Sequence, residues 1–202
     1  MHIRGGVAAV ALSIAFGLPG SACSARRSAE GPEAPGTMYS FKRMPDGVEW
    51  TTENLNVNTD GSYCYGNAEP NCNRYGRLYT WDSARRGCQS LGDGWRLPTN
   101  EEWRQLAKHH GGLREEAEDS GRAAYMALLA GGSSGFGAVL GGGRVSDDEQ
   151  FARLEAHGFY WTASTSGPTS AWFYNFGKGG LSLNRHRDGD QQMAISVRCV
   201  RG

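Results

Sequence analysis

The glycine-rich centre of the chain contains the pattern of a catalytic serine. Residues Gly131–Gly135, GGSSG, match the G-x-S-x-G nucleophile elbow of serine hydrolases, which needs a strand before the serine and a helix after it. The residues before the pattern, AAYMALLA, favour a helix, and the residues after it are rich in glycine. A dinucleotide-binding loop is excluded as well. Gly135 and Gly137 begin a G-x-G-x-x-G pattern, but the third glycine is at Gly141, one residue later than the pattern requires. We therefore predict a loop here and no nucleophile.

Two short acidic segments, Asp147–Glu149 and Asp188–Asp190, carry the oxygen ligands that hard cations prefer. Solvated surface turns also explain both segments, and we favour that interpretation. The histidines form no metal-binding pattern: His109 and His110 are adjacent, so on a helix their rings point about 100° apart, and the others stand alone. We predict no metal and no cofactor.

The decapeptide Gly94–Trp103, GWRLPTNEEW, concentrates two tryptophans, an arginine and two carboxylates. Its local chemistry is that of a helix start. Thr99 and Glu102 have the spacing of a capping box, in which the hydroxyl accepts a backbone N–H and the carboxylate reaches back. Apolar residues then recur at helical spacing until Gly111. Direct contact with a ligand is the alternative; we predict a structural role and a helix over 100–110.

The spacing of apolar residues predicts elements on both sides of this helix. A helix over 80–91 would carry Cys88 on its buried face, and a weaker helix would span 113–130. Residues 56–76 are rich in Asn, Gly and Asp and are predicted as a loop. Alternating, aromatic and β-branched residues predict antiparallel strands over 47–51, 159–163, 171–176, 181–185 and 195–200.

The N-terminus has the pattern of an export signal. Residues 1–22 contain an early arginine, an apolar run too short to cross a bilayer as a helix, and small residues at the end. The text before Cys23 is similar to a bacterial lipoprotein cleavage box, so we expect lipidation of Cys23, with ordinary cleavage after Ala22 as the alternative. Residues 23–40 are then a flexible tether, and 41–202 the folded domain. This predicts an outer-membrane lipoprotein of the cell envelope, or a secreted protein.

The balance of charge excludes some classes of partner. The chain has 21 basic and 21 acidic residues, so no net field attracts nucleic acid or an acidic membrane surface. Its 30 glycines concentrate at 131–143 and 177–189, which favours short strands and long loops over a helical bundle. We predict no nucleic-acid partner, and contact with a membrane only through a lipid anchor at Cys23.

The cysteines fit an oxidising compartment. Setting Cys23 aside leaves Cys64, Cys72, Cys88 and Cys199, an even number that suits two disulfides. Zinc binding is the alternative use, but the sequence has no C-x2-C pair and no histidine at zinc-finger spacing. The count leaves three pairings open: 64–72 with 88–199, 64–88 with 72–199, or 64–199 with 72–88.

Seven motifs follow one another in a distinctive order. They are ENLN at 53–56, the excursion between Cys64 and Cys72, YGRLYTW at 75–81, GWRLPTNEEW at 94–103, GFGAVLGGGR at 135–144, FYWTAS at 159–164 and SVRCVR at 196–201. From about Phe41 to Arg201 the chain thereby resembles the Fibrobacter succinogenes major paralogous domain family, which is similar to the C-type-lectin-like fold. The resemblance implies an α+β domain in which two helices pack on a small twisted antiparallel sheet with long glycine-rich loops. Members are typically exported bacterial proteins, and the biochemical role of most is undefined.

The resemblance also implies a disulfide from the first helix to the last strand. Because Cys64 and Cys72 would close a short loop, we expect the pairing Cys64–Cys72 and Cys88–Cys199. The text Glu69–Asn71, EPN, spells the calcium- and sugar-binding tripeptide of mannose-type C-type lectins. In those lectins it follows both helices, whereas here it precedes the first, so we predict no calcium-dependent sugar site.

Enzymes of the formylglycine-generating type share this fold and the text RLPT-x-x-EW. They need a reactive cysteine pair that binds copper, or a histidine-rich iron site, and two structural bridges would leave no thiolate for the first. We therefore predict a non-catalytic module that binds an extracellular or envelope glycan or protein without calcium. A structural or adhesive surface lipoprotein is the second hypothesis, and a formylglycine-generating-type enzyme is the third.

The predicted ligand contacts lie on the late strands. They are Trp172, Tyr174, Asn175 and Arg185, chosen because they offer stacking, hydrogen bonding and charge on neighbouring strands. One face of each strand must belong to the core. Since the faces are inferred from alternation alone, an error of one residue would turn half of this set into core.

Overall fold

The computed structural model describes residues 39–92, 94–147 and 149–202. All of them belong to the second of the chain's two units, Gly36–Gly202. The predicted signal peptide over 1–22, Cys23 and most of the predicted tether lie outside the described residues. None of the helices in the described part is long and apolar enough to cross a membrane.

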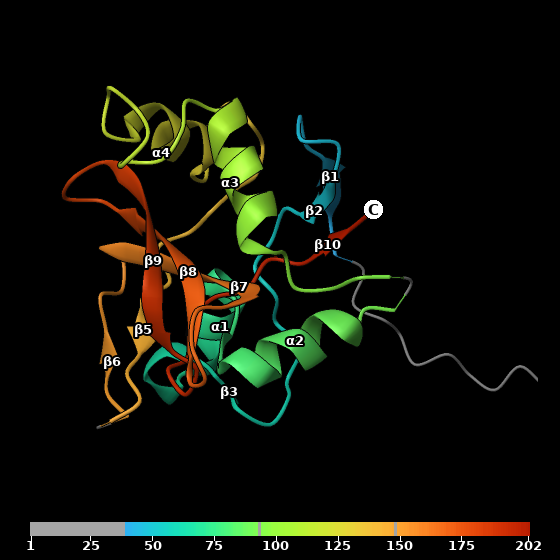
Figure 1. The fold of residues 1–202 in the computed structure, drawn as a ribbon. Coiled ribbons are helices and arrows are strands. Elements are labelled where there is room, and N and C mark those ends of the chain that lie inside the picture. Colours follow the sequence, from blue (N-terminus) through green and yellow to red (C-terminus); the bar gives the residue numbers. More distant parts are fainter. Residues whose placement is uncertain (1–38, 93, 148) are drawn as a thin grey trace, which may run out of the picture. The chain divides into compact units, whose positions relative to one another are not determined.

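Four α-helices and one 3-10 helix occur in the described part (Figure 1). They are η1 (Tyr65–Asn67), α1 (Glu69–Tyr75), α2 (Trp81–Gln89), α3 (Asn100–His109) and α4 (Arg122–Leu128). The predictions of α2 and α3 are confirmed. The predicted helix over 113–130 is wrong in its first half, because the Asp119 carboxylate accepts the backbone N–H of Ala123 at 2.7 Å and so fixes a later helix start. The loop predicted over 56–76 contains α1, with Pro70 in the first turn, where proline suits a helix.

The capping box at the start of α3 is confirmed. Thr99 Oγ1 accepts the backbone N–H of Glu102 at 3.1 Å, and Glu102 Oε2 accepts the backbone N–H of Thr99 at 2.8 Å. Arg96 adds two hydrogen bonds to the same carboxylate, at 2.6 and 2.9 Å. Burial alone would raise the pKa of Glu102, but the hydrogen bonds from Arg96 and Thr99 outweigh it and lower that pKa below its ordinary value. GWRLPTNEEW is therefore a helix start that the Arg96–Glu102 ion pair reinforces.

The strands form four small antiparallel sheets, so the fold is mixed α+β: β1–β2–β10, β3–β4, β5–β6 and β7–β8–β9. Their bounds are β1 (Phe41–Arg43), β2 (Glu49–Thr51), β3 (Ser62–Tyr63), β4 (Leu78–Tyr79), β5 (Gly143–Arg144), β6 (Phe151–Ala152), β7 (His157–Thr165), β8 (Ser170–Gly177), β9 (Ser182–Asp190) and β10 (Val200–Arg201). The predictions of β2, β7, β8 and β9 are confirmed. The strand predicted over 195–200 is wrong for most of its length, because residues 194–196 make only single bridges to other segments.

The core consists of two clusters. In the first, α3 and α4 pack against β7–β8–β9 (Figure 1). Trp103 of α3 is fully buried, and its ring lies 5.1 Å from that of Tyr174 and 5.0 Å from that of Trp50. In the second cluster, α2 packs on Trp161 of β7 and on the final segment of the chain.

The expected disulfide pairing is confirmed. Cys88 of α2 is bonded to Cys199, and Cys64 to Cys72, with sequence separations of 111 and 8. Cys88 and Cys199 are fully buried in the second cluster. This bridge therefore ties α2 to the end of the chain, whereas the other bridge closes a short loop across η1 and α1.

A fully buried arginine, Arg198, lies beside Cys199. Its guanidinium donates to Asn54 Oδ1 at 2.7 Å and to the backbone oxygens of Thr51, Phe136 and Gly137 at 2.9, 2.6 and 2.6 Å. The ring of Phe136 lies 4.5 Å from the guanidinium carbon. Burial lowers the pKa of Arg198 below its ordinary value, but four charge-assisted hydrogen bonds hold the cation in place.

Replacing this arginine should destabilise the domain strongly. We expect Arg198→Met to lower the free energy of unfolding by about 3–5 kcal/mol, because it leaves buried oxygens without donors. Arg198→Lys should recover only part of the loss, since an ammonium lacks the planar fork. Urea denaturation measures both, with Arg187→Met, at an exposed arginine, as the control that should change little. An Arg198→Met protein as stable as the control would contradict this role.

Candidate ligand-binding face

The register of β7–β8–β9 assigns its side chains to two faces. Tyr160 is opposite Tyr174, which is opposite Arg185, so these three residues share one face. The next row on that face is Gly158, Phe176 and Leu183. Tyr160 and Tyr174 are fully buried in the cluster that contains α3 and α4. This is the inner face of the sheet.

The outer face carries three rows of a different character. The rows are Trp161–Phe173–His186, Phe159–Asn175–Asn184 and His157–Gly177–Ser182. Most of these side chains are only partly buried, in contrast to the inner rows. Trp161 is fully buried in the second core cluster, whereas the two phenylalanines, the two imidazoles and Asn184 are partly exposed. Aromatic rings, imidazoles and an amide therefore remain partly exposed on this face.

The structure corrects the predicted ligand set, because its four residues do not share a surface. Tyr174 is fully buried and its hydroxyl donates to the backbone oxygen of Asn100 at 3.0 Å, so it belongs to the core and cannot stack on a surface ligand. Arg185 lies over the partly exposed ring of Trp172, 5.1 Å from its centroid, on the same side of the sheet. Asn175 is on the opposite, outer face.

Four rings of the outer face contact one another in turn. His157 stacks on Phe159 with centroids 5.4 Å apart, Phe159 meets the edge of Phe173 at 6.0 Å, and Phe173 stacks on His186 at 4.9 Å. Such pairs hold each ring in one orientation. The row of rings forms a continuous path across the three strands.

An apolar cavity of about 400 Å³ opens beside Phe159 and Phe173. Its other lining residues come from β5, β6 and the segment before residue 196: Gly143, Arg144, Val145, Ala152, Arg153, Met193 and Ile195. A Cβ at Gly143 would lie 3.1 Å from Ile195 Cγ2, so glycine allows the close approach of these segments. The cavity is large enough for one small apolar or aromatic group.

A polar groove of about 220 Å³ lies on the same face. It is lined by Arg114, His157, Asn175, Gly177, Gly179, Gly180, Ser182, Asn184 and His186. His157 Nδ1 is 2.9 Å from Asn175 Oδ1, and Asn184 Nδ2 donates to Ser182 Oγ at 3.1 Å. His186 Nε2 is buried and has no hydrogen-bond partner among the described residues. A buried polar atom without a partner favours a ligand that supplies one.

Other candidate residues have structural roles. Ser134 Oγ donates to the backbone oxygen of Ala127 at 2.6 Å and accepts the N–H of Phe136, so the hydroxyl closes a loop, as predicted. Of the acidic segments, Asp147 and Asp190 meet at Ser146, whose hydroxyl is 3.4 and 2.8 Å from their carboxylates. This contact is that of a hydrogen-bonded turn.

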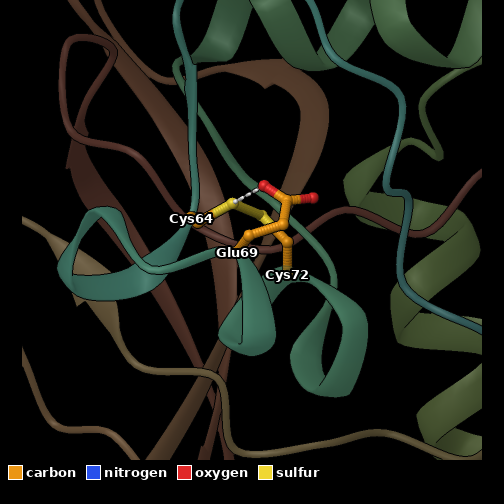
Figure 2. Close-up of side chains that lie close together, drawn as sticks. All are labelled: Cys64, Glu69 and Cys72. Atoms are coloured by element: carbon orange, nitrogen blue, oxygen red, sulfur yellow. Dashed lines mark hydrogen bonds between the residues drawn. A yellow bond between two sulfur atoms is a disulfide. The ribbon is translucent and has the colours of Figure 1, made fainter.

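Cys64, Glu69 and Cys72 bring three possible metal ligands within 4.8 Å of one another (Figure 2). Both sulfurs are consumed by the disulfide. A metal needs thiolates, so this cluster does not fit a metal ion while the bridge is closed.

Sequence reasoning found Asn175 but overlooked the rings and imidazoles around it. The signal lay in the alternation of β7 and β8 with Phe159 and Phe173 one row apart. It required the register of three strands, which single-strand alternation does not provide.

A buried and a partly exposed ring of β8 should respond differently to substitution. Tyr174→Ala should lower the free energy of unfolding by about 3–5 kcal/mol, because it empties a filled core site. Trp172→Ala, at a partly exposed ring two residues away, should cost roughly 1 kcal/mol. Thermal and urea denaturation of both variants measure the difference; equal losses would contradict the burial of Tyr174 in the core.

Comparison with known proteins places the domain in a family. The family model of the Fibrobacter succinogenes major domain matches residues 38–201. No curated protein and no solved structure matched the chain. The matched residues include every element from β1 to β10. The chain therefore belongs to the Fibrobacter succinogenes major domain family.

Proposed function

We propose that this domain is a non-catalytic binding module with a C-type-lectin-like fold, and that it holds a glycan on the outer face of β7–β8–β9 without calcium. The observation that carries the proposal is the meeting of an apolar cavity and a polar groove on one sheet. Phe173 of the cavity and His186 of the groove are stacked neighbours. A sugar ring has apolar C–H faces and polar hydroxyls, so it can use both parts together.

The rigidity of the face supports binding. Its residues lie on strands that are packed from behind by α3 and α4, and a preformed site loses less conformational freedom when a ligand binds. A protein ligand is the alternative occupant, with an aromatic side chain in the cavity. A purely structural or adhesive lipoprotein is the second candidate function; it would not need an unpartnered imidazole nitrogen in a groove.

The cysteines bear on the enzyme hypothesis. Chemistry of the formylglycine-generating type with copper requires thiolates, and the four cysteines of the described part form two disulfides. This supports a binding role over catalysis. The export pattern before Cys23 supports a location in the cell envelope, as an outer-membrane lipoprotein or a secreted protein.

Binding should depend on both parts of the face. A glycan array followed by calorimetry, using the mature chain, should find a saturable ligand. Asn184→Ala should weaken its binding at least tenfold, since it removes polar contacts from the groove, and Val145→Glu should do the same by placing a charge at the cavity mouth. Neither residue is in the core, so the melting temperature should change little.

The matched control is Met126→Glu, at an exposed apolar residue of α4 that lies away from the outer face. It should bind as the native protein does. Chelation of calcium should leave the affinity unchanged. A ligand whose binding is lost with chelator, or is equally sensitive to Met126→Glu, would refute the proposed site.

The location can be tested at the N-terminus. If Cys23 is lipidated, Cys23→Ser should move the protein from the membrane pellet to the soluble fraction, because stable anchoring needs acyl chains. Fractionation with mass spectrometry of the native N-terminus measures this. A native protein without acyl mass, and with unchanged fractionation of the variant, would favour ordinary secretion.

A further inference from the structure

We propose that Cys64–Cys72 is a redox-active disulfide, which a low-molecular-weight thiol opens by attack on Cys72 while Cys64 leaves as a thiolate beside Arg77. The two sulfurs of this bridge have different surroundings, and the difference sets the direction of the reaction. The other disulfide has neither the cation nor the cleft described below.

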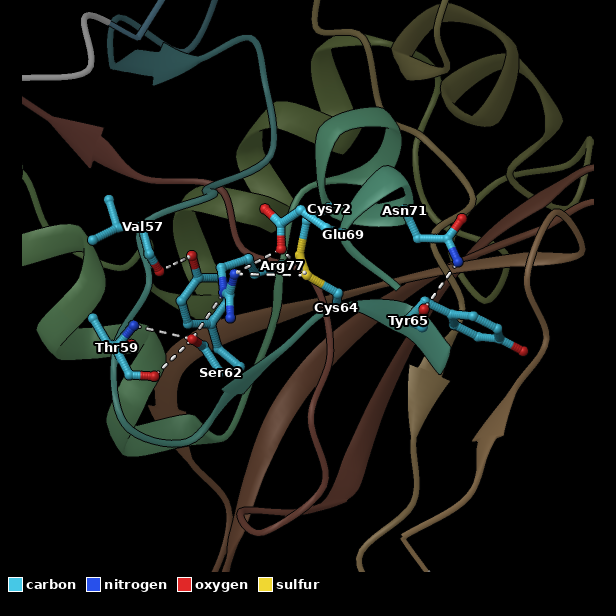
Figure 3. Close-up of a disulfide and its surroundings, with 10 residues drawn as sticks. Val57, Thr59, Ser62, Cys64, Tyr65, Glu69, Asn71, Cys72 and Arg77 are labelled. Atoms are coloured by element: carbon cyan, nitrogen blue, oxygen red, sulfur yellow. Dashed lines mark hydrogen bonds and ion pairs between the residues drawn. A yellow bond between two sulfur atoms is a disulfide. The ribbon is translucent and has the colours of Figure 1, made fainter. Parts of the chain in front are cut away.

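Arg77 lies against the sulfur of Cys64 (Figure 3). Its Nη1 is 3.6 Å from Cys64 Sγ, and its Nε donates to Ser62 Oγ at 3.0 Å, which holds the guanidinium in place. The Arg77 side chain is only 13% exposed. A neighbouring cation stabilises a thiolate, and the sulfur that forms the more stable thiolate is the better leaving group in disulfide exchange.

Glu69 opposes this effect but is more strongly screened. Its Oε2 is 3.3 Å from Cys64 Sγ (Figure 2) and 4.0 Å from Arg77 Nη1. A disulfide sulfur carries no proton, so the carboxylate accepts nothing from it and would repel a thiolate. The Glu69 side chain is 70% exposed, and water reduces the field of an exposed charge more than that of a buried one. The guanidinium therefore dominates at Cys64.

Cys72 is 1% exposed and Cys64 is 6% exposed, and Cys72 borders a cleft. It lines a cleft of about 300 Å³ whose other residues are mostly polar: Tyr39, Thr52, Glu53, Asn54, Asn56, Asn73, Arg74, Tyr75, Gly76, Gly137 and Val139. This volume suits a small molecule. A thiolate in the cleft would approach the bridge from the side of Cys72, since Cys72 lines this cleft and Cys64 does not.

The reaction balances with two equivalents of thiol. The first thiolate forms a bond to Cys72 Sγ as the Cys64–Cys72 bond breaks, and the electron pair remains on Cys64. A second thiolate attacks the mixed disulfide, releases the Cys72 thiolate and leaves as the oxidised dimer. The protein gains two electrons from the two thiols, and solvent supplies protons to the cysteines.

Cys88–Cys199 should resist the same reagent. Both cysteines are fully buried in the core. The chain thus combines one bridge inside the core with one bridge that borders a cleft.

The test is a redox titration of the native, full chain in glutathione buffers of increasing reducing strength, followed by alkylation and peptide mass mapping. Cys64 and Cys72 should be alkylated while Cys88 and Cys199 remain bonded. Early quenching should find glutathione on Cys72. Arg77→Gln should slow reduction roughly tenfold, Arg77→Lys should restore much of the rate, and Glu69→Gln should accelerate reduction.

Three results would overturn the proposal. They are simultaneous opening of both bridges, glutathione trapped mainly on Cys64, or an Arg77→Gln rate equal to that of the native protein. Because Arg77→Lys keeps the charge and the length of the side chain, it separates loss of the cation from a general loosening of the loop. Circular dichroism of each variant before reduction confirms that it is folded.

Discussion

A single buried cation organises this domain. The Arg198 guanidinium is buried and donates hydrogen bonds to four neutral oxygens, three of which are backbone carbonyls. Desolvation of an unmatched charge costs several kcal/mol, so every acceptor must stay in place. These acceptors come from β2, from the residues just after it and from the glycine-rich loop. Asn54 links this network to α1, because its amide donates to the backbone oxygen of Tyr75 at the end of that helix. Segments distant in sequence are thus fixed around one side chain.

This constraint explains why the motifs of the family need not reveal a ligand. ENLN supplies Asn54, GFGAVLGGGR supplies Phe136 and Gly137, and SVRCVR supplies Arg198 itself. GWRLPTNEEW supplies the Arg96–Glu102 ion pair and Trp103, which lies in the first core cluster. Most of the rings and polar groups of the outer face lie outside these motifs. The family motifs therefore describe the scaffold, and most residues of the proposed ligand-binding face lie outside them.

Much of the fold could be predicted from local sequence patterns. Which residues are buried could not, because burial depends on segments that are distant in the sequence. The start of α3 follows from capping, and α2 and the strands β7 to β9 follow from periodicity, whereas the disulfide pairing came from the family resemblance together with the short loop between Cys64 and Cys72. Tyr174 was misassigned because alternation separates two faces without saying which is buried. The burial of Arg198 cannot be predicted from alternation. Val197, Arg198 and Cys199 are all fully buried, because this segment is enclosed from both sides. A charged residue there is stable only because four distant oxygens converge, and no local pattern contains them.

The candidate site has a buried polar atom without a hydrogen-bond partner, and it differs from the other such atoms of the described residues because it lies beside a cavity. The described part contains four buried polar atoms without a hydrogen-bond partner: Trp103 Nε1, His110 Nε2, His186 Nε2 and Ser196 Oγ. Such an atom alone can be a cost that core packing offsets, as for Trp103 at the centre of the first cluster. His186 is the one that also lines a cavity described above, beside amides and a ring that are held by strands. An unpaired polar atom beside a cavity is therefore the feature that supports the proposed binding face.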